Sequence, residues 1–369
     1  MHSLSTYLKR VVDMWSRDTY LAFGYECETA IQVFTHYAYR YRLTRAICRI
    51  LKLHVDASGS WEVVTPPVKI SDIESIKLLN TLLLVLKCCY HPNVSPIDTY
   101  YRSSGLYQSL EKPFIQTVRS VLDGAPSCEC RCRLDLGMVP CGRHVHVDLR
   151  SLKWLSRDNL HDTYVTVIRA IPTLLPLYSA KRVGELYMVR RRACEYAGEV
   201  YQYPTPRSRL ETQCRVANGV ALINDKGKLT LELRICEGSL PQAWAVACIT
   251  YALALVDRSR VEMYLPTIRE VRNILLKAEK VGISPWDEHV GTSNLFEAYF
   301  ELAKECIHAL ERGEILSREA VKLLEVVVLR EFTMDKAHLW HTHASKYPEF
   351  IHVGLVESIE RSVKQLATC

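Results

Sequence analysis

The sequence of 369 residues contains no run of about eighteen consecutive apolar residues, so we expect no membrane span. The first residues, MHSLSTYLKRVVDMW, lack the apolar segment and the small-residue cleavage site of a signal peptide. The net charge of +6 is dispersed, and we find no nucleic-acid-binding motif. These absences favour a cytoplasmic protein without membrane or nucleic-acid partners.

Dense disulfide spacing is also absent, although the chain has 14 cysteines. A chain of this length has no need of a disulfide scaffold, so buried free thiols are the better expectation. One cluster stands apart and comprises Cys128, Cys130, Cys132 and Cys141. It can bind zinc, form disulfides or stay reduced, and its CxCxC spacing is not the usual CxxC zinc knuckle.

The pattern of apolar residues predicts an α+β protein. Strands are expected over 20–31, within 53–68, at the HVHVD segment, and over 211–224 and 228–236. Helices are expected over 4–17, from the Ser71/Glu74 capping box to about Leu86, and from Pro241 to about Arg258. Short turns separate the strands, so the sheet is expected to be mostly antiparallel.

We divide the chain into a catalytic domain over 1–258, with an insertion at 91–127, and a helical region over 259–369. In the last region His338, His341 and His343 can form a second metal site, but a surface group of histidines is favoured, because no carboxylate or cysteine lies at ligand spacing.

Charged residues recur at alternate positions of the predicted strands, where an unpartnered charge is rare. They comprise the carboxylates Glu26, Glu28, Glu62 and Glu232, the imidazoles His144 and His146, and the guanidinium groups Arg215 and Arg234. Carboxylates with an occasional imidazole suit Mg²⁺ or Mn²⁺, and arginines grip phosphate and carboxylate groups. The set therefore fits phosphoryl transfer. Neither GxxxxGK[ST] nor GxGxxG after a strand is present, so a nucleotide would lie on the sheet itself.

Four segments in this order, FGYECE, DASGSWEVVTPP, CGRHVHVD and LTLELRICEGSL, resemble the amidoligase family. That family belongs to the carboxylate–amine ligase superfamily, with glutamine synthetase and glutamate–cysteine ligase. The resemblance covers about residues 20–258, and Tyr25 and Arg143 depart from the family pattern. It implies a curved antiparallel sheet with helices on one face, ATP and Mg²⁺ or Mn²⁺ as cofactors, and a carboxylate and an amine or ammonia as substrates.

The resemblance also implies a role for each site residue. The expected metal ligands are Glu26, Glu28, Glu62, His144 and Glu232. Arg215 and Arg234 are expected to hold phosphate and carboxylate groups, with Asn218 as a further nucleotide contact. His146 is expected to contact substrate or phosphate. It lies one strand step, about 6.6–6.8 Å, beyond His144, so we expect it to be too far away to share the same ion.

Two alternatives to a ligase remain open from the sequence. A non-catalytic relative would keep the sheet and bind a nucleotide or a partner protein. A small-molecule kinase would phosphorylate one acceptor on the same kind of sheet. The oligomeric state and the identity of both substrates stay open.

Overall fold

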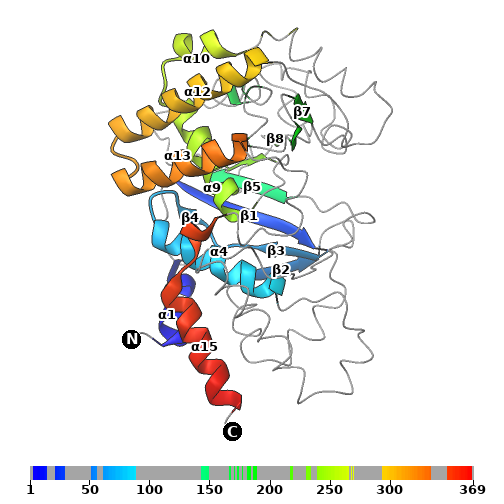
Figure 1. The fold of residues 1–369 in the computed structure, drawn as a ribbon, viewed down its shortest axis with the longest axis vertical. Coiled ribbons are helices and arrows are strands. Elements are labelled where there is room, and N and C mark those ends of the chain that lie inside the picture. The colour runs from blue at the N-terminus through cyan, green and yellow to red at the C-terminus, as the bar shows by residue number, and fades with distance from the viewer. Residues whose placement is uncertain are drawn as a thin grey trace.

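A computed structural model gives the structure of the protein. It describes residues 3–14, 21–29, 51–55, 61–88, 143–148, 166–167, 170, 173, 177, 181–183, 186–188, 217–218, 230–233, 239–265, 267, 269, 293–333 and 347–367. Within these residues the fold is α+β, with a small open antiparallel sheet and with more residues in helices than in strands (Figure 1). The coarse fold class predicted from the sequence is therefore confirmed.

The sheet has seven strands in the described residues. Their bounds are Ala22–Thr29 for β1, Lys52–Val55 for β2, Trp61–Val64 for β3, Val68–Lys69 for β4, Arg143–Asp148 for β5, Ala217–Asn218 for β8 and Thr230–Leu233 for β9. The order is β2-β3-β1-β5-β9-β8, with β4 paired to the start of β1, and every pairing is antiparallel. A separate hairpin, which the sequence did not predict, pairs β6 (Lys181–Val183) with β7 (Leu186–Met188).

The register separates an apolar face of the sheet from a polar one. On the apolar face Tyr25 lies opposite Val145, which in turn lies opposite Leu233, and all three side chains are buried. Residues directly opposite each other in an antiparallel pair share a face, so the alternate positions of the same strands form the polar face. The alternation of valine with histidine in RHVHVD thus follows from a strand with one apolar and one polar face.

A break between β3 and β4 is bridged by a side chain. Pro66 and Pro67 lack N–H groups and cannot continue the ladder. Thr65 takes over the pairing: its backbone N–H donates to the carbonyl of Tyr25 at 2.9 Å, and its hydroxyl accepts from the Tyr25 N–H at 2.9 Å. Thr65 therefore holds β1 at Tyr25, between the Gly24 and Glu26 positions of the polar face.

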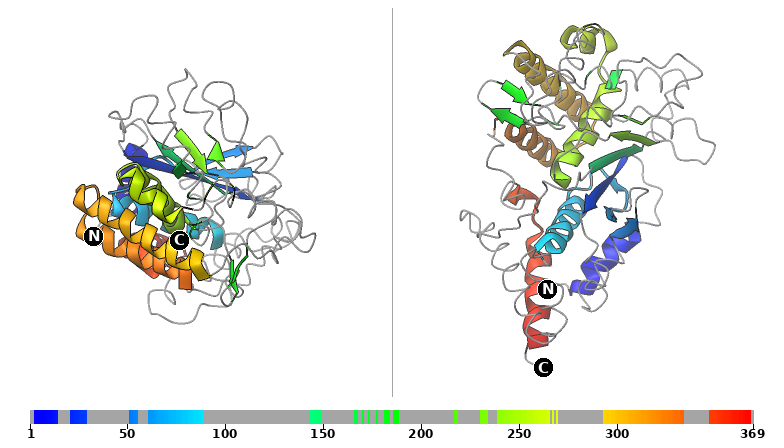
Figure 2. Two further views of the ribbon diagram at one scale, coloured as in Figure 1. Left: turned by 90° about the horizontal axis from the view of Figure 1, so that it is seen from above. Right: turned by 90° about the vertical axis from the view of Figure 1, so that its right-hand side faces the viewer.

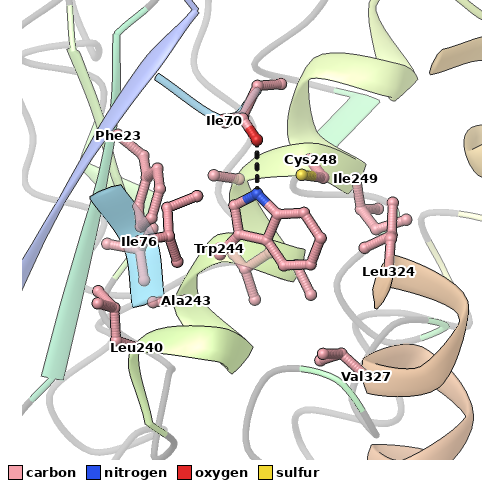
Figure 3. Packing of buried hydrophobic residues seen from close by; sticks show 14 of the residues in the cluster. Phe23, Ile70, Ile76, Leu240, Ala243, Trp244, Cys248, Ile249, Leu324 and Val327 are labelled. Carbon is pink, nitrogen blue, oxygen red and sulfur yellow. Dashed lines mark hydrogen bonds between the residues drawn. The ribbon is translucent and has the colours of Figure 1, made fainter. Parts of the chain in front are cut away.

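Two helices cover the apolar face: α4 (Ile73–Cys88) and α9 (Leu240–Leu253), as the views in Figure 2 show. All fourteen residues of α9 are buried. Trp244 is at its centre, packed among side chains of the sheet and of two helices, and its Nε1 donates to the carbonyl of Ile70 at 2.8 Å (Figure 3). α9 begins at Leu240, one residue before the predicted start at Pro241, and ends at Leu253, before the predicted end near Arg258.

Two helix starts differ from the predictions. α4 is capped by Asp72, whose carboxylate accepts from the N–H of Ser75 at 3.1 Å, so the predicted Ser71 cap is wrong by one position. The chain turns after α9 and starts a separate helix, α10 (Arg258–Tyr264), whose cap residue is Asp257. The Asp257 carboxylate accepts from the N–H of Ser259 at 2.8 Å. Both carboxylates satisfy helix N–H groups that have no partner within the helix.

The described residues beyond α10 are mostly helical. They form α12 (Ser293–Arg312), α13 (Arg318–Thr333), the short 3-10 helix η4 (Pro348–Phe350) and α15 (Val353–Ala367), and α1 (Leu4–Met14) packs against α15 and α4. One continuous hydrophobic core joins the sheet, α4, α9 and these C-terminal helices. No helix among the described residues combines the length and the hydropathy needed to cross a membrane.

Candidate metal centre on the polar face

Four ionisable side chains converge on the polar face from three adjacent strands. Glu26 comes from β1, His144 and His146 from the central β5, and Glu232 from β9. One ligand atom of each, a carboxylate oxygen or an imidazole nitrogen, lies within 4.8 Å of all the others. A group of this composition and spacing can hold a cation.

The register explains why these four side chains meet. Glu26 lies opposite His144, whereas His146 lies opposite Gly24 on one side and Glu232 on the other. Each carboxylate thus has one histidine directly across from it and the other on the diagonal. Diagonal neighbours across a strand pair are about 7–8 Å apart, which long side chains can bridge.

The distances match this crossed arrangement. His144 Nδ1 lies 3.3 Å from Glu26 Oε2 and 3.4 Å from Glu232 Oε1. His146 Nε2 lies 3.1 Å from the same Glu26 oxygen. His144 and His146 are a strand step apart, as expected, but different ring nitrogens turn toward one carboxylate, so this separation does not keep the two rings from one site.

The electrostatics of the centre keep Glu26 ionised. Burial raises the pKa of Glu26, but the hydrogen bond with His144 and the neighbouring His146 imidazole lower it more, and the net effect holds this pKa well below its usual range. Glu26 is thus deprotonated, the form in which a carboxylate can bind a cation.

The Nδ1 atom of His144 cannot donate one full hydrogen bond to each of the two carboxylates, Glu26 and Glu232. An imidazole nitrogen carries at most one hydrogen, so the single Nδ1–H of His144 can donate fully to Glu26 or to Glu232. His146 Nε2 is buried and has no hydrogen-bond partner among the described residues, so its 3.1 Å approach to Glu26 is close but not aligned. A cation among the four groups would bind all of these atoms at once.

A second row of polar residues follows the first along the sheet. The register places Glu28 opposite Glu62, and Glu62 opposite His54 of β2. Glu28 is two positions from Glu26 on β1, so the strand positions of Glu28 and Glu62 belong to the polar face, as their alternation predicted. The sequence analysis missed His54, although its place between Leu53 and Val55 repeats the signal that identified Glu62.

Other predicted site residues are placed only in part. Asn218 lies opposite Glu232, on β8 at the edge of the polar face. Arg215 and Arg234 lie outside the described residues, as do the cluster of Cys128, Cys130, Cys132 and Cys141, the histidines His338, His341 and His343, and the 91–127 segment.

The chemistry of the centre is thus set by a small group of strand residues. Two imidazoles and two carboxylates, lying on the polar face of the sheet, can bind a divalent cation. Comparisons of the sequence with protein-family models and with curated proteins find no match.

Proposed function

We propose that the protein is an ATP-dependent carboxylate–amine ligase that forms an amide through an acyl phosphate. The observation that carries this proposal is the convergence of Glu26, His144, His146 and Glu232 on the polar face of an antiparallel sheet. The same face carries the Glu28 and Glu62 positions in the next row. The four segments that resemble the amidoligase family supply the two glutamate strands, the histidine strand and the Glu232 strand of this face.

The reaction accounts for the residue types on that face. An oxygen of the substrate carboxylate attacks the γ-phosphorus of ATP and releases ADP. The amine then attacks the acyl carbon, and phosphate leaves with one oxygen that came from the carboxylate. Because negative charge gathers on the phosphates, a divalent cation held by the glutamates and histidines, Mg²⁺ or Mn²⁺, would neutralise it. Arg215, Arg234 and Asn218 are proposed to bind phosphate and carboxylate groups.

The proposal includes the finer fold assignment. An antiparallel sheet with helices on its apolar face and a row of carboxylates and histidines on its polar face is the arrangement implied by the resemblance to the glutamine synthetase superfamily. We therefore assign the sheet to that superfamily's catalytic fold, with the region around 259–369 as a helical addition.

The test separates a ligase from a kinase and from a non-catalytic relative. The purified full-length chain is incubated with ATP, Mg²⁺ or Mn²⁺, and each proteinogenic amino acid or a small dicarboxylate as the acid, with hydroxylamine as the amine. A ligase releases ADP and phosphate and forms a hydroxamate, and an ¹⁸O label in the carboxylate appears in the phosphate. A phosphorylated product formed without the amine would identify a kinase. ATP binding without turnover across the whole panel would favour the non-catalytic relative.

A further inference from the structure

We infer that the centre formed by Glu26, His144, His146 and Glu232 prefers a first-row transition-metal ion, such as Mn²⁺, over Mg²⁺, because His146 is a direct ligand. This inference rests on the metal site of the proposed function and specifies its cofactor. It departs from the sequence-based expectation, in which His146 contacted only substrate or phosphate.

The distances support one ion with four protein ligands. Around an ion with bonds of about 2.1 Å, adjacent ligand atoms lie about 3.0–3.4 Å apart and opposite ones about 4.2 Å apart. The contacts from Glu26 to His146, from Glu26 to His144 and from His144 to Glu232 are 3.1, 3.3 and 3.4 Å. The remaining separations do not exceed 4.8 Å, so a small movement of the side chains completes the set.

Gly24 leaves space beside the fourth ligand. It lies opposite His146, and a Cβ atom added there would come no closer than 3.9 Å to His146 Cβ. With hydrogen as the only side chain on that position, the His146 ring can reach diagonally to Glu26. His144, directly opposite Glu26, uses its nearer nitrogen Nδ1, whereas His146 uses the farther nitrogen Nε2.

The nitrogen and oxygen donor atoms of the site determine which metal ion it binds most tightly. Mg²⁺ takes oxygen ligands almost exclusively and keeps several waters, so a single imidazole among carboxylates is near its limit. Two imidazole nitrogens with two carboxylate oxygens suit the series from Mn²⁺ to Zn²⁺ instead. Mn²⁺ is the member of that series that also binds phosphate oxygens readily, which an ATP-dependent reaction requires.

The experiment measures metal binding to the full chain without nucleotide. Isothermal titration with Mn²⁺ and with Mg²⁺ is expected to give a dissociation constant at least about tenfold lower for Mn²⁺. H146D exchanges one nitrogen donor for oxygen and is expected to reduce that preference by about tenfold or more. H308N, at an exposed position on α12, is the matched control and should leave both constants unchanged. Circular dichroism melts confirm that each variant is folded.

A spectroscopic measurement identifies the ligands directly. Electron spin-echo envelope modulation of bound Mn²⁺ is expected to show coupling to two imidazole nitrogens in the wild type and to one in H146D. Three outcomes would each overturn the inference. The first is coupling to a single imidazole in the wild type, and the second is an equal preference for Mn²⁺ over Mg²⁺ in the wild type and H146D. The third is the absence of Mn²⁺ binding. Amide formation with a single-imidazole site would leave the proposed function standing, whereas a two-imidazole Mn²⁺ site without amide formation would reject the function and keep the site.

Discussion

Glu26 Oε2 lies 3.1 Å from His146 Nε2, although the register of the sheet pairs Glu26 with His144 and His146 with Gly24. The contact joins diagonal neighbours of the β1–β5 pair. It lies beside Gly24, which has no side chain beyond hydrogen. It joins the two histidines of β5 to one carboxylate, and it makes Gly24 part of the site's architecture.

The first prediction concerns the size of the residue at position 24. G24A is expected to fold normally and to keep its Mn²⁺ affinity within about twofold, because the added Cβ makes only an ordinary contact with His146. G24L adds a branched side chain on the polar face and is expected to displace the His146 ring, lowering Mn²⁺ affinity about tenfold or more. Isothermal titration measures both. Equal affinity in G24L and the wild type would show that the diagonal approach of His146 does not depend on the open position.

The second prediction concerns the bridge between β1 and β3. T65V keeps the shape of the buried Thr65 side chain but removes the hydroxyl that accepts from the Tyr25 N–H. We expect the free energy of unfolding to fall by about 1–3 kcal/mol, the cost of removing one partner of a buried hydrogen bond. Urea denaturation measures the loss. T65S, which keeps the hydroxyl, is the control, and a T65V variant as stable as T65S would contradict the bridging role.

The strand residues show how far the sequence could predict the site. Alternation in FGYECET and RHVHVD correctly assigned the positions of Glu26, Glu28, His144 and His146 to one face, because side-chain direction in a strand follows from backbone geometry. Alternation does not fix which residues face each other across strands. The pairing of His146 with Gly24, and with it the diagonal contact to Glu26, depends on the register and became visible only in the structure.

Helix boundaries show a second kind of limit. Ser71 and Asp72 are both good cap residues, so residue type alone does not choose between them, and in the structure Asp72 is the cap. The predicted helix from Pro241 to about Arg258 merged two helices, because the apolar pattern continues while Asp257 starts α10. The available signal was Asp257 itself, because aspartate is a preferred N-cap residue.

The third prediction concerns the centre of the core. W244F removes the N–H that donates to the Ile70 carbonyl and leaves unfilled volume beside α9. We expect a loss of about 2–4 kcal/mol in the free energy of unfolding, from the hydrogen bond and the cavity together. Urea denaturation followed by circular dichroism measures this. M263A, at an exposed position on α10, should change stability by less than about 0.5 kcal/mol, and a similar small change in W244F would contradict the role of Trp244.

The last prediction concerns the pH dependence of α15. His352 is its N-cap: the unprotonated Nδ1 accepts from the N–H of Leu355 at 3.0 Å, and the ring packs edge-on against Tyr7. Burial lowers the pKa of His352, the charge of Glu74 and a backbone hydrogen bond oppose this, and the charges of Arg10 and Lys77 lower the pKa further, so the net shift is downward. Protonation would replace the acceptor with a donor and place a positive charge at the positive end of the helix.

The sign of the effect follows from that lowered pKa. Since the unfolded chain binds a proton at His352 more readily than the folded chain, its contribution to stability is fully present above the unfolded pKa of about 6.5 and is lost as the pH falls through the lower folded value. Hydrogen exchange of α15 amides, corrected for the intrinsic pH dependence, should therefore show weaker protection at a pH of about 5.5 than at about 7.5. H352N keeps a cap acceptor that does not titrate, so its α15 protection should change less between the two pH values. An equal loss of protection in H352N and the wild type would assign the pH dependence to other groups.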